Sequence, residues 1–245
     1  MNGIPCLCPW EITVDARLDV VWNLHQLLFA IHVGLIAAMH LGTPCTTFTR
    51  ARIPQLRSTR QPMGLVGLPT SMQAMVDKGN TLALVSCQLC VALLENEAFF
   101  SLENPEHSVL WMLPQVLAVF DLPGVASVLL TYAAYGTLYL KPTIILHNLP
   151  TLHALAKPLP LERGPTVELR GWVMFEGKRT ARTLLAQVYP PDLSRRYADL
   201  LQEALSGRAS ALAADHEVPM AQVASSHGLP VGGRSRRILK LATSY

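Results

Sequence analysis

Short apolar segments alternate with longer helix-like segments along most of this chain, and this alternation restricts the fold more than any other feature. Apolar segments of this length are typical of strands that are buried on both faces of a sheet. Because helix-like segments separate them, their order predicts a parallel sheet with helices on both faces. Strands are expected at residues 4–12, 35–41, 99–102, 125–132 and 143–147, helices at residues 19–33, 71–95, 110–119 and 193–205, an irregular basic loop at residues 50–69, and a hairpin within residues 161–177.

Two of the predicted strands end in residues that can take part in catalysis. Residues 35–41 run into a Gly-Thr-Pro-Cys loop that ends at Cys45, and residues 99–102 run into a Glu-Asn-Pro turn that begins at Glu103. The carboxyl ends of parallel strands meet at one edge of a sheet, where α/β proteins bind their ligands, so these two side chains are expected to lie close together. A thiol beside a carboxylic acid pairs a nucleophile with a proton donor. Each residue alone also has a structural explanation: a buried cysteine at a strand end, and an acid that caps the next helix.

The loop after Cys45 is basic. Residues 46–76 contain no Asp or Glu, whereas residues 50–60 contain four arginines. The net charge of +3 is too small to imply a polyanionic partner by itself, but a local arginine cluster without acids suits phosphate contacts. A solvated basic loop explains the cluster equally well. The residues assigned to nucleic-acid contact are Thr49, Arg50, Arg52, Arg57 and Arg60.

Together, the Pro-Cys loop and the Glu-Asn turn resemble the motifs of the cytosine-C5 DNA methyltransferases. The order and spacing also resemble a compact, divergent branch of phage-like and mobile-element-linked methylase-like proteins of protists. Pro44 and Cys45 match the nucleophile loop, and Phe48 and Thr49 match the aromatic residue and the serine that follow it. Glu103 and Asn104 match the Glu-Asn-Val turn. The chain departs from the family at Thr46, where the family has glutamine, and at Pro105, where it has valine.

Two weaker echoes extend the resemblance toward the carboxyl end. The segment from Tyr135 to Thr143 resembles a family motif that ends in two spaced arginines, with Lys141 at the first arginine position and Thr143 at the second. Residues 187–191 resemble the closing Asn-Ala-Val-Pro-Pro motif. About forty residues separate Thr143 from this closing motif, which leaves no room for the family's target-recognition segment. The resemblance therefore implies either low DNA sequence specificity or a partner that supplies target recognition.

The resemblance implies a Rossmann-like class I methyltransferase, an α/β fold with a mostly parallel sheet, that uses S-adenosyl-L-methionine to methylate cytosine in DNA. The Cys45 thiolate adds to C6 of the base, which makes C5 reactive, and Glu103 acts as the acid near N3. Lys141 assists at O2 or holds a phosphate. The base must leave the duplex stack to reach Cys45, so an adjoining basic loop fits base flipping.

The resemblance places cofactor contacts at Trp10, Glu11, Asp19, Gly42 and Pro44. In this family an acid such as Glu11 holds the ribose, an aromatic such as Trp10 packs on adenine, and an acid such as Asp19 faces the adenine amine. Glu11 as a surface residue and Asp19 as an acid near a helix start are equally good explanations. No glycine-rich turn precedes these residues, so the fold is expected to be incomplete at the amino end, and a truncated or inactive enzyme is one alternative. The expected domains are a methyltransferase-like domain at residues 1–205 and a flexible basic tail at residues 206–245.

Five cysteines without a signal peptide indicate a reducing compartment, hence an intracellular protein, nuclear in a eukaryote. Pairing the Cys6-Leu7-Cys8 segment with Cys87 and Cys90 would make four zinc ligands. The latter two lie in an apolar helical stretch, where cysteine serves as a core residue, so no metal is expected.

Residues 20–41 contain no Asp, Glu, Lys or Arg and are long enough to span a bilayer. The segment nevertheless carries three histidines, an asparagine and a glutamine, which favour an amphipathic helix followed by a strand. No membrane contact is therefore expected. Two other functions remain open: a non-catalytic nucleic-acid-binding remnant of the methyltransferase fold and, third, a small membrane protein.

Overall fold

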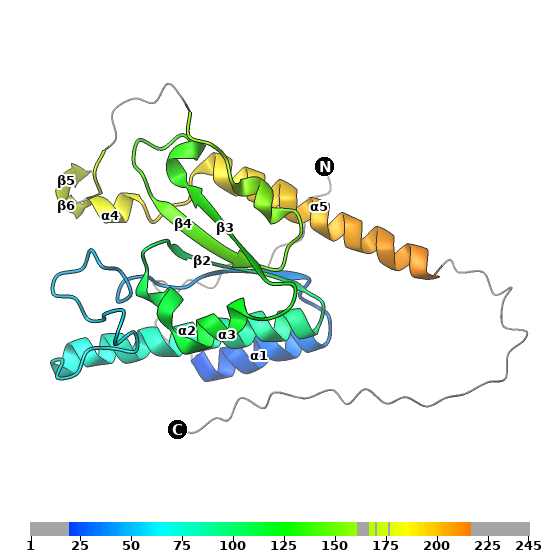
Figure 1. The fold of residues 1–245 in the computed structure, drawn as a ribbon, viewed down its shortest axis with the longest axis horizontal. Helices are drawn as coiled ribbons and strands as arrows, with labels where there is room; N and C mark the ends of the chain where they lie inside the picture. Colours follow the sequence, from blue (N-terminus) through cyan, green and yellow to red (C-terminus); the bar gives the residue numbers. More distant parts are fainter. Residues whose placement is uncertain (1–19, 161–166, 170, 176, 217–245) are drawn as a thin grey trace, which may run out of the picture. The chain divides into compact units, whose positions relative to one another are not determined.

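The computed structural model describes residues 20–160, 167–169, 171–175 and 177–216. The chain divides into two compact units, residues 1–208 and residues 209–245. The first unit is an α/β structure built on a four-stranded mixed sheet, with helices on both of its faces (Figure 1). The strand expected at residues 4–12 lies outside the described residues, as do Trp10, Glu11 and Asp19.

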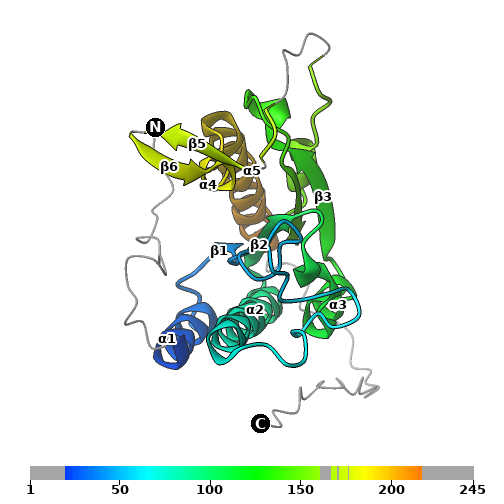
Figure 2. The same cartoon turned by 90° about the vertical axis from the view of Figure 1, so that its left-hand side faces the viewer.

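The sheet has the strand order β1-β2-β4-β3. Strand β1 pairs in parallel with β2, and β4 runs antiparallel to both of its neighbours, β2 and β3. Strands β1, β2 and β3, which Figure 2 labels, therefore share one direction, and β4 runs in the opposite direction between β2 and β3. The strand bounds are Ala38–Gly42 for β1, Phe99–Pro105 for β2, Ala126–Thr131 for β3 and Pro142–His147 for β4.

The α/β class is as predicted, but the sheet was expected to be mostly parallel and is mixed. Only one of the three strand pairings in this four-stranded sheet is parallel. The reversal of β4 follows from its short connection to β3, which spans residues 132–141 and contains the single 3-10 turn η2, Tyr132–Tyr135. A parallel crossover needs a dozen or more residues. At the end of η2, Gly136 adopts a left-handed conformation with φ 84°, which favours glycine.

Helices α1 (Val20–His32), α2 (Thr70–Glu95) and α3 (Pro114–Phe120) cover one face of the sheet. The single helix expected at residues 110–119 is in fact the 3-10 turn η1 (Val109–Met112) followed by α3, because Pro114 starts a new helix at its first turn. Three short elements precede the last helix: the 3-10 turn η3 (Leu152–Leu155), the hairpin of β5 (Trp172–Phe175) and β6 (Lys178–Ala181), and α4 (Arg182–Leu185).

Helix α5 (Pro191–His216) covers the other face of the sheet with its first turns. The expected boundary between domain and tail lies at residue 206, and the chain divides into its two compact units after residue 208. The helix expected at residues 193–205 is longer than predicted, because α5 continues to His216. The alanines in this stretch favour helix. The rest of the predicted tail, residues 217–245, lies outside the described residues.

Two apolar cores flank the sheet. The core on the side of α2 includes Phe100 and Leu102 of β2, and the core on the side of α5 includes Ile145 of β4. Cys87 and Cys90 lie buried in the first core, where burial raises the pKa of Cys87 to about 12 and that of Cys90 well above its usual value. Both cysteines thus serve as core residues, as expected. Among the described helices, none is both long and apolar enough to cross a membrane.

Candidate functional site

The register of β1 and β2 places the two predicted catalytic residues at the same edge of the sheet. Gly42, the last residue of β1, pairs with Glu103 of β2, and the chain reaches Cys45 three residues later. The Asn104 amide donates a hydrogen bond to the Thr43 carbonyl (2.7 Å) and so ties the Gly-Thr-Pro-Cys loop to β2. The Glu-Asn-Pro segment was expected to be a turn, but it forms the end of β2, because β4 supplies a pairing partner for each of its residues.

The carboxylate of Glu103 is bound from both sides. Lys141 Nζ lies 3.4 Å from its Oε1 atom, and the Tyr189 hydroxyl lies 3.3 Å from its Oε2 atom. Lys141 also donates to the Tyr132 hydroxyl at 3.0 Å. The side chains of this ion pair are only 15% and 8% exposed for Lys141 and Glu103, so water screens the pair weakly.

The thiol of Cys45 is half-buried beside this ion pair. Burial raises the pKa of Cys45, the Lys141 ammonium lowers it, and the Glu103 carboxylate raises it. The balance is a rise, so the sulfur carries its proton at neutral pH and needs a base to become a nucleophile. Burial also raises the pKa values of Tyr132 and Tyr189, so both phenols stay protonated.

A second layer of polar side chains lies beneath Glu103. His40 of β1 contacts the Tyr189 hydroxyl through Nε2 (3.0 Å) and the Ser101 hydroxyl through Nδ1 (2.7 Å). Ser101 in turn lies 2.7 Å from the hydroxyl of Tyr197 on α5. Sequence reasoning assigned no role to His40, Ser101 or Tyr197. The one available signal was strand alternation, which places His40 and Ser101 on the same face as Glu103.

Arg57 was expected to contact nucleic acid, but the structure buries it. Its guanidinium donates to Thr47 Oγ1, the Pro62 and Val76 carbonyls and Asn80 Oδ1, and it stacks 3.9 Å from the centre of the Phe48 ring. Desolvation lowers its pKa to about 10, so it stays charged. A side chain at Gly79 would put a carbon 2.9 Å from this guanidinium, which explains a glycine inside α2. Arg57 therefore holds the loop together.

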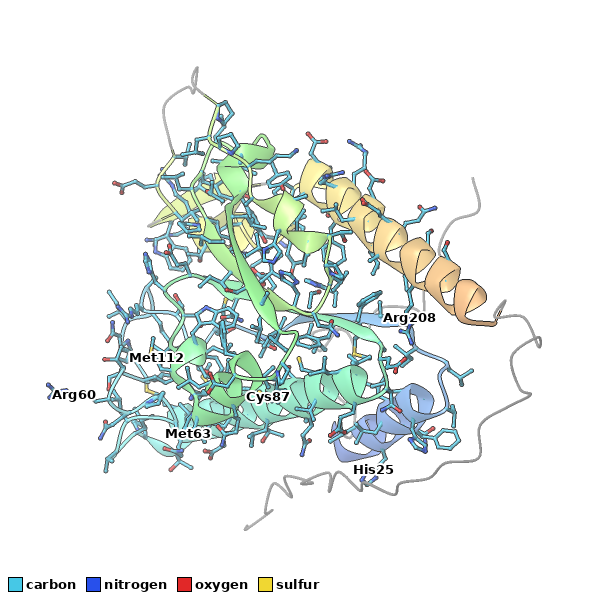
Figure 3. The ribbon with its side chains drawn as sticks, turned by 45° about the vertical axis from the view of Figure 1, so that its right-hand side comes forward. His25, Arg60, Met63, Cys87, Met112 and Arg208 are labelled. Atoms are coloured by element: carbon cyan, nitrogen blue, oxygen red, sulfur yellow. The ribbon has the colours of Figure 1, made fainter. Side chains whose placement is uncertain are left out.

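The other residues assigned to nucleic-acid contact lie nearer the surface. Arg50 and Arg60 are exposed, and Arg60 projects from the outer tip of its loop (Figure 3). Arg52 is partly buried and approaches the sulfur of Met75 at 3.7 Å. The Thr49 hydroxyl accepts a hydrogen bond from the backbone of Ala51, so it stabilises the local turn. A hollow of about 280 Å³ adjoins this loop and is lined by Arg50, Gln55, Arg57, Ser58, Thr59 and Val109.

Of the five residues assigned to S-adenosylmethionine, the described part of the chain contains Gly42 and Pro44. Trp10, Glu11 and Asp19 lie outside the described residues, so neither acid assigned to the ribose and the adenine can be placed. Pro44 lies in the loop before Cys45, and Gly42 lies against Tyr189: a Cβ at residue 42 would be 3.3 Å from the hydroxyl. The described residues bring a thiol, a carboxylate and an ammonium group together at this edge.

Comparison with known proteins finds no matching family model, no matching curated protein and no matching solved structure. Within the described part of the chain, no three His, Cys, Asp or Glu side chains lie close enough together to hold a metal ion. The geometry of Cys45, Glu103 and Lys141 is therefore the main basis for a functional proposal.

Proposed function

We propose that this protein is a cytosine-C5 DNA methyltransferase-like protein in which Cys45 attacks the base and Glu103 acts as the acid. The observation that carries the proposal is the meeting of Cys45, Glu103 and Lys141 at the edge where two parallel strands end. Ligands of α/β proteins bind at such edges. Doubly wound sheets often include an antiparallel strand near one edge, so the reversed β4 is compatible with a Rossmann-like fold.

The charges at the site suggest how a thiol with a raised pKa becomes reactive. The Glu103 carboxylate takes the proton of the Cys45 thiol, which produces a thiolate and a carboxylic acid together. The thiolate forms a bond to C6 of cytosine. The electron pair of the C5–C6 double bond shifts to C4–C5, that of C4–N3 moves onto N3, and N3 takes the proton from Glu103. The net result is transfer of the thiol proton to N3, with Glu103 again a carboxylate.

Lys141 supports both stages of this sequence. Its ammonium lowers the pKa of Cys45 and so favours the thiolate. It also lies beside the oxygen of Glu103 that is not bound by Tyr189, donates to the Tyr132 hydroxyl and lies over the Tyr132 ring. A partly buried cation that these groups hold in place stabilises negative charge as it moves between the carboxylate and the sulfur.

The proposed substrate is DNA, because exposed arginines follow the nucleophile loop and cytosine must be presented unstacked to a half-buried thiol. Arg50 and Arg60 are the proposed phosphate contacts, with Arg52 beside them. A partner that supplies target recognition and an intracellular, thiol-reducing location are parts of the same proposal. S-adenosylmethionine remains the proposed cofactor because the resemblance implies it, and no step is derived through it.

The proposal is tested by covalent trapping with DNA that contains 5-fluorocytosine, with and without S-adenosylmethionine. The protein and its Cys45→Ala variant are compared on denaturing gels. An adduct that survives denaturation and disappears in the variant is the expected result.

If the folded protein binds the DNA but forms no adduct, the proposed enzymatic activity is rejected. That result would favour the second function, a nucleic-acid-binding remnant of the fold. A folded protein that neither forms an adduct nor binds DNA would reject both functions.

A further inference from the structure

A hydrogen-bond chain leads to Glu103 from the face of the sheet that α5 covers. Its last link is the contact of 3.3 Å between the Tyr189 hydroxyl and Glu103 Oε2. A carboxylate can only accept hydrogen bonds, so Tyr189 must donate its single proton here. The Tyr189 oxygen then has to accept from its other neighbour, His40 Nε2, at 3.0 Å. The carboxylate thus fixes the direction of both bonds.

The same logic extends the chain to α5. The His40 residue is exposed as a whole, but its ring contacts the rings of both Tyr189 and Tyr197. Desolvation of the ring lowers the pKa of His40 to about 4, so the ring is neutral at pH 7. A neutral ring with its proton on Nε2 leaves Nδ1 as an acceptor, which takes the Ser101 proton at 2.7 Å. The Ser101 oxygen then accepts from the Tyr197 hydroxyl, also at 2.7 Å. Every bond points toward Glu103.

Packing holds Tyr189 in this place. Its ring meets the His40 ring edge-on, with centroids 5.5 Å apart, and lies 6.2 Å from the Tyr132 ring. The hydroxyl lies against Gly42, where any larger residue would place a carbon 3.3 Å away. A phenol this confined loses little freedom when it donates its hydrogen bond, so it can fix the orientation of the group that it binds.

We propose that Tyr189, oriented by His40, is a positioning residue that holds the Glu103 carboxylate beside Cys45. Lys141 binds one carboxylate oxygen and Tyr189 the other, which sets the plane of the carboxylate relative to the sulfur. The inference deepens the proposed function and rests on it, because Glu103 must face both the thiol and the base. It makes the proposed active site dependent on Tyr189, which lies two residues before α5 and does not itself react.

The test replaces Tyr189 by phenylalanine and measures Cys45 directly. The alkylation rate of Cys45 is followed from pH 7 to 10 by mass spectrometry of the peptide that contains it. Without the phenol, the carboxylate charge is less compensated and repels a thiolate more strongly. The pH midpoint of alkylation is expected to rise by about half a unit. At a fixed pH below the midpoint, this rise makes the alkylation rate of Cys45 about threefold lower. Formation of the 5-fluorocytosine adduct is expected to slow about tenfold.

The matched control is Tyr135→Phe, which removes a buried hydroxyl bonded to the Leu155 carbonyl (2.7 Å), away from Glu103. Its alkylation profile should coincide with that of the unchanged protein, even if its stability falls. Gly42→Ala is a second probe that keeps the phenol and displaces it slightly; a smaller rise of the midpoint is expected. If Tyr189→Phe does not fold, the shift in Gly42→Ala decides the question.

The two proposals can fail separately. In one outcome, the unchanged protein forms no adduct while Tyr189→Phe still raises the pH midpoint of Cys45 alkylation. That outcome would reject the proposed function but support the role of Tyr189 in positioning Glu103. A folded Tyr189→Phe protein with an unchanged alkylation profile would overturn this inference, whatever the adduct assay shows.

Discussion

The two faces of strand β2 differ although their residues alternate along the same strand. Phe100 and Leu102 point into the core beside α2 and are fully buried among apolar side chains. Ser101 and Glu103 point to the side of α5 and contact tyrosine hydroxyls there. Dense packing holds the side chains of the first face in place. Hydrogen bonds hold those of the second face: Tyr189, 86 positions after Glu103, and Tyr197, 96 positions after Ser101, supply the partners.

This difference separates stability from chemistry. On the apolar face, removal of atoms is expected to cost free energy of unfolding without changing the site. On the polar face, removal of one hydroxyl should change the reactivity of Cys45 more than the stability of the fold. Substitutions on each face, measured for both properties, can break or sharpen the comparison.

The largest loss of stability is expected from Leu102→Ala. Leu102 is fully buried, and a cavity left by a leucine costs about 3 to 5 kcal/mol. Urea unfolding measures the loss. Cys45 alkylation under native conditions should remain unchanged, and an altered pH profile would mean that the two faces are not independent.

A loss of about 3 kcal/mol is expected from Arg57→Met, because the carbonyls and side-chain oxygens that accept from the guanidinium lose their charged donor. Arg60→Ala, an exposed arginine of the same loop, is the control and should stay within about 0.5 kcal/mol. Equal losses in the two variants would contradict a structural role that is specific to Arg57.

Acid should destabilise the protein through His147, which is buried on β4 near His153. Burial, and then the charge of His153, lower its pKa to about 4, so the folded state disfavours its protonated form. Its contribution is intact above the usual pKa of 6.5 and is lost as the pH falls. The loss is about 2 kcal/mol between pH 7 and pH 5. Chemical unfolding at both pH values measures the loss, and His147→Phe should remove it. An unchanged pH dependence in the variant would assign the acid sensitivity to other groups.

The smallest effect concerns DNA binding. Arg60→Ala should weaken DNA affinity severalfold and lower the salt dependence by about one counterion. Fluorescence anisotropy at several salt concentrations measures both. A normal salt slope in this variant would remove Arg60 from the proposed interface.

The sequence predicts the positions of strands and helices well where apolar segments are bounded clearly. It places Cys45 and Glu103 at strand ends, and the register of β1 and β2 brings them together. The sequence of β4 does not predict the direction of this strand, because the pattern of apolar residues is the same in a parallel and an antiparallel strand. Only the length of the preceding connection carries that information.

Burial of charged side chains is also hidden from a local reading. Arg57 and Arg60 are neighbours in one basic loop, yet one is buried and the other exposed, because Asn80 and the carbonyl of Val76 on α2 are available only to the first. Tyr189 reaches Glu103 across 86 positions of sequence, a contact that no spacing rule indicates.

The central claim, that Cys45 adds to cytosine C6, is tested most directly by hydrogen exchange at C5 without S-adenosylmethionine. Addition to C6 makes C5 basic, so it takes a proton from solvent, and elimination leaves the exchanged atom on the base. DNA that carries deuterium at cytosine C5 is incubated with the protein and with its Cys45→Ser variant, and deuterium loss is measured by mass spectrometry. Deuterium loss with the unchanged protein and none with Cys45→Ser is the predicted result. Equal retention of deuterium with both proteins, under conditions where each binds the DNA, would contradict the account.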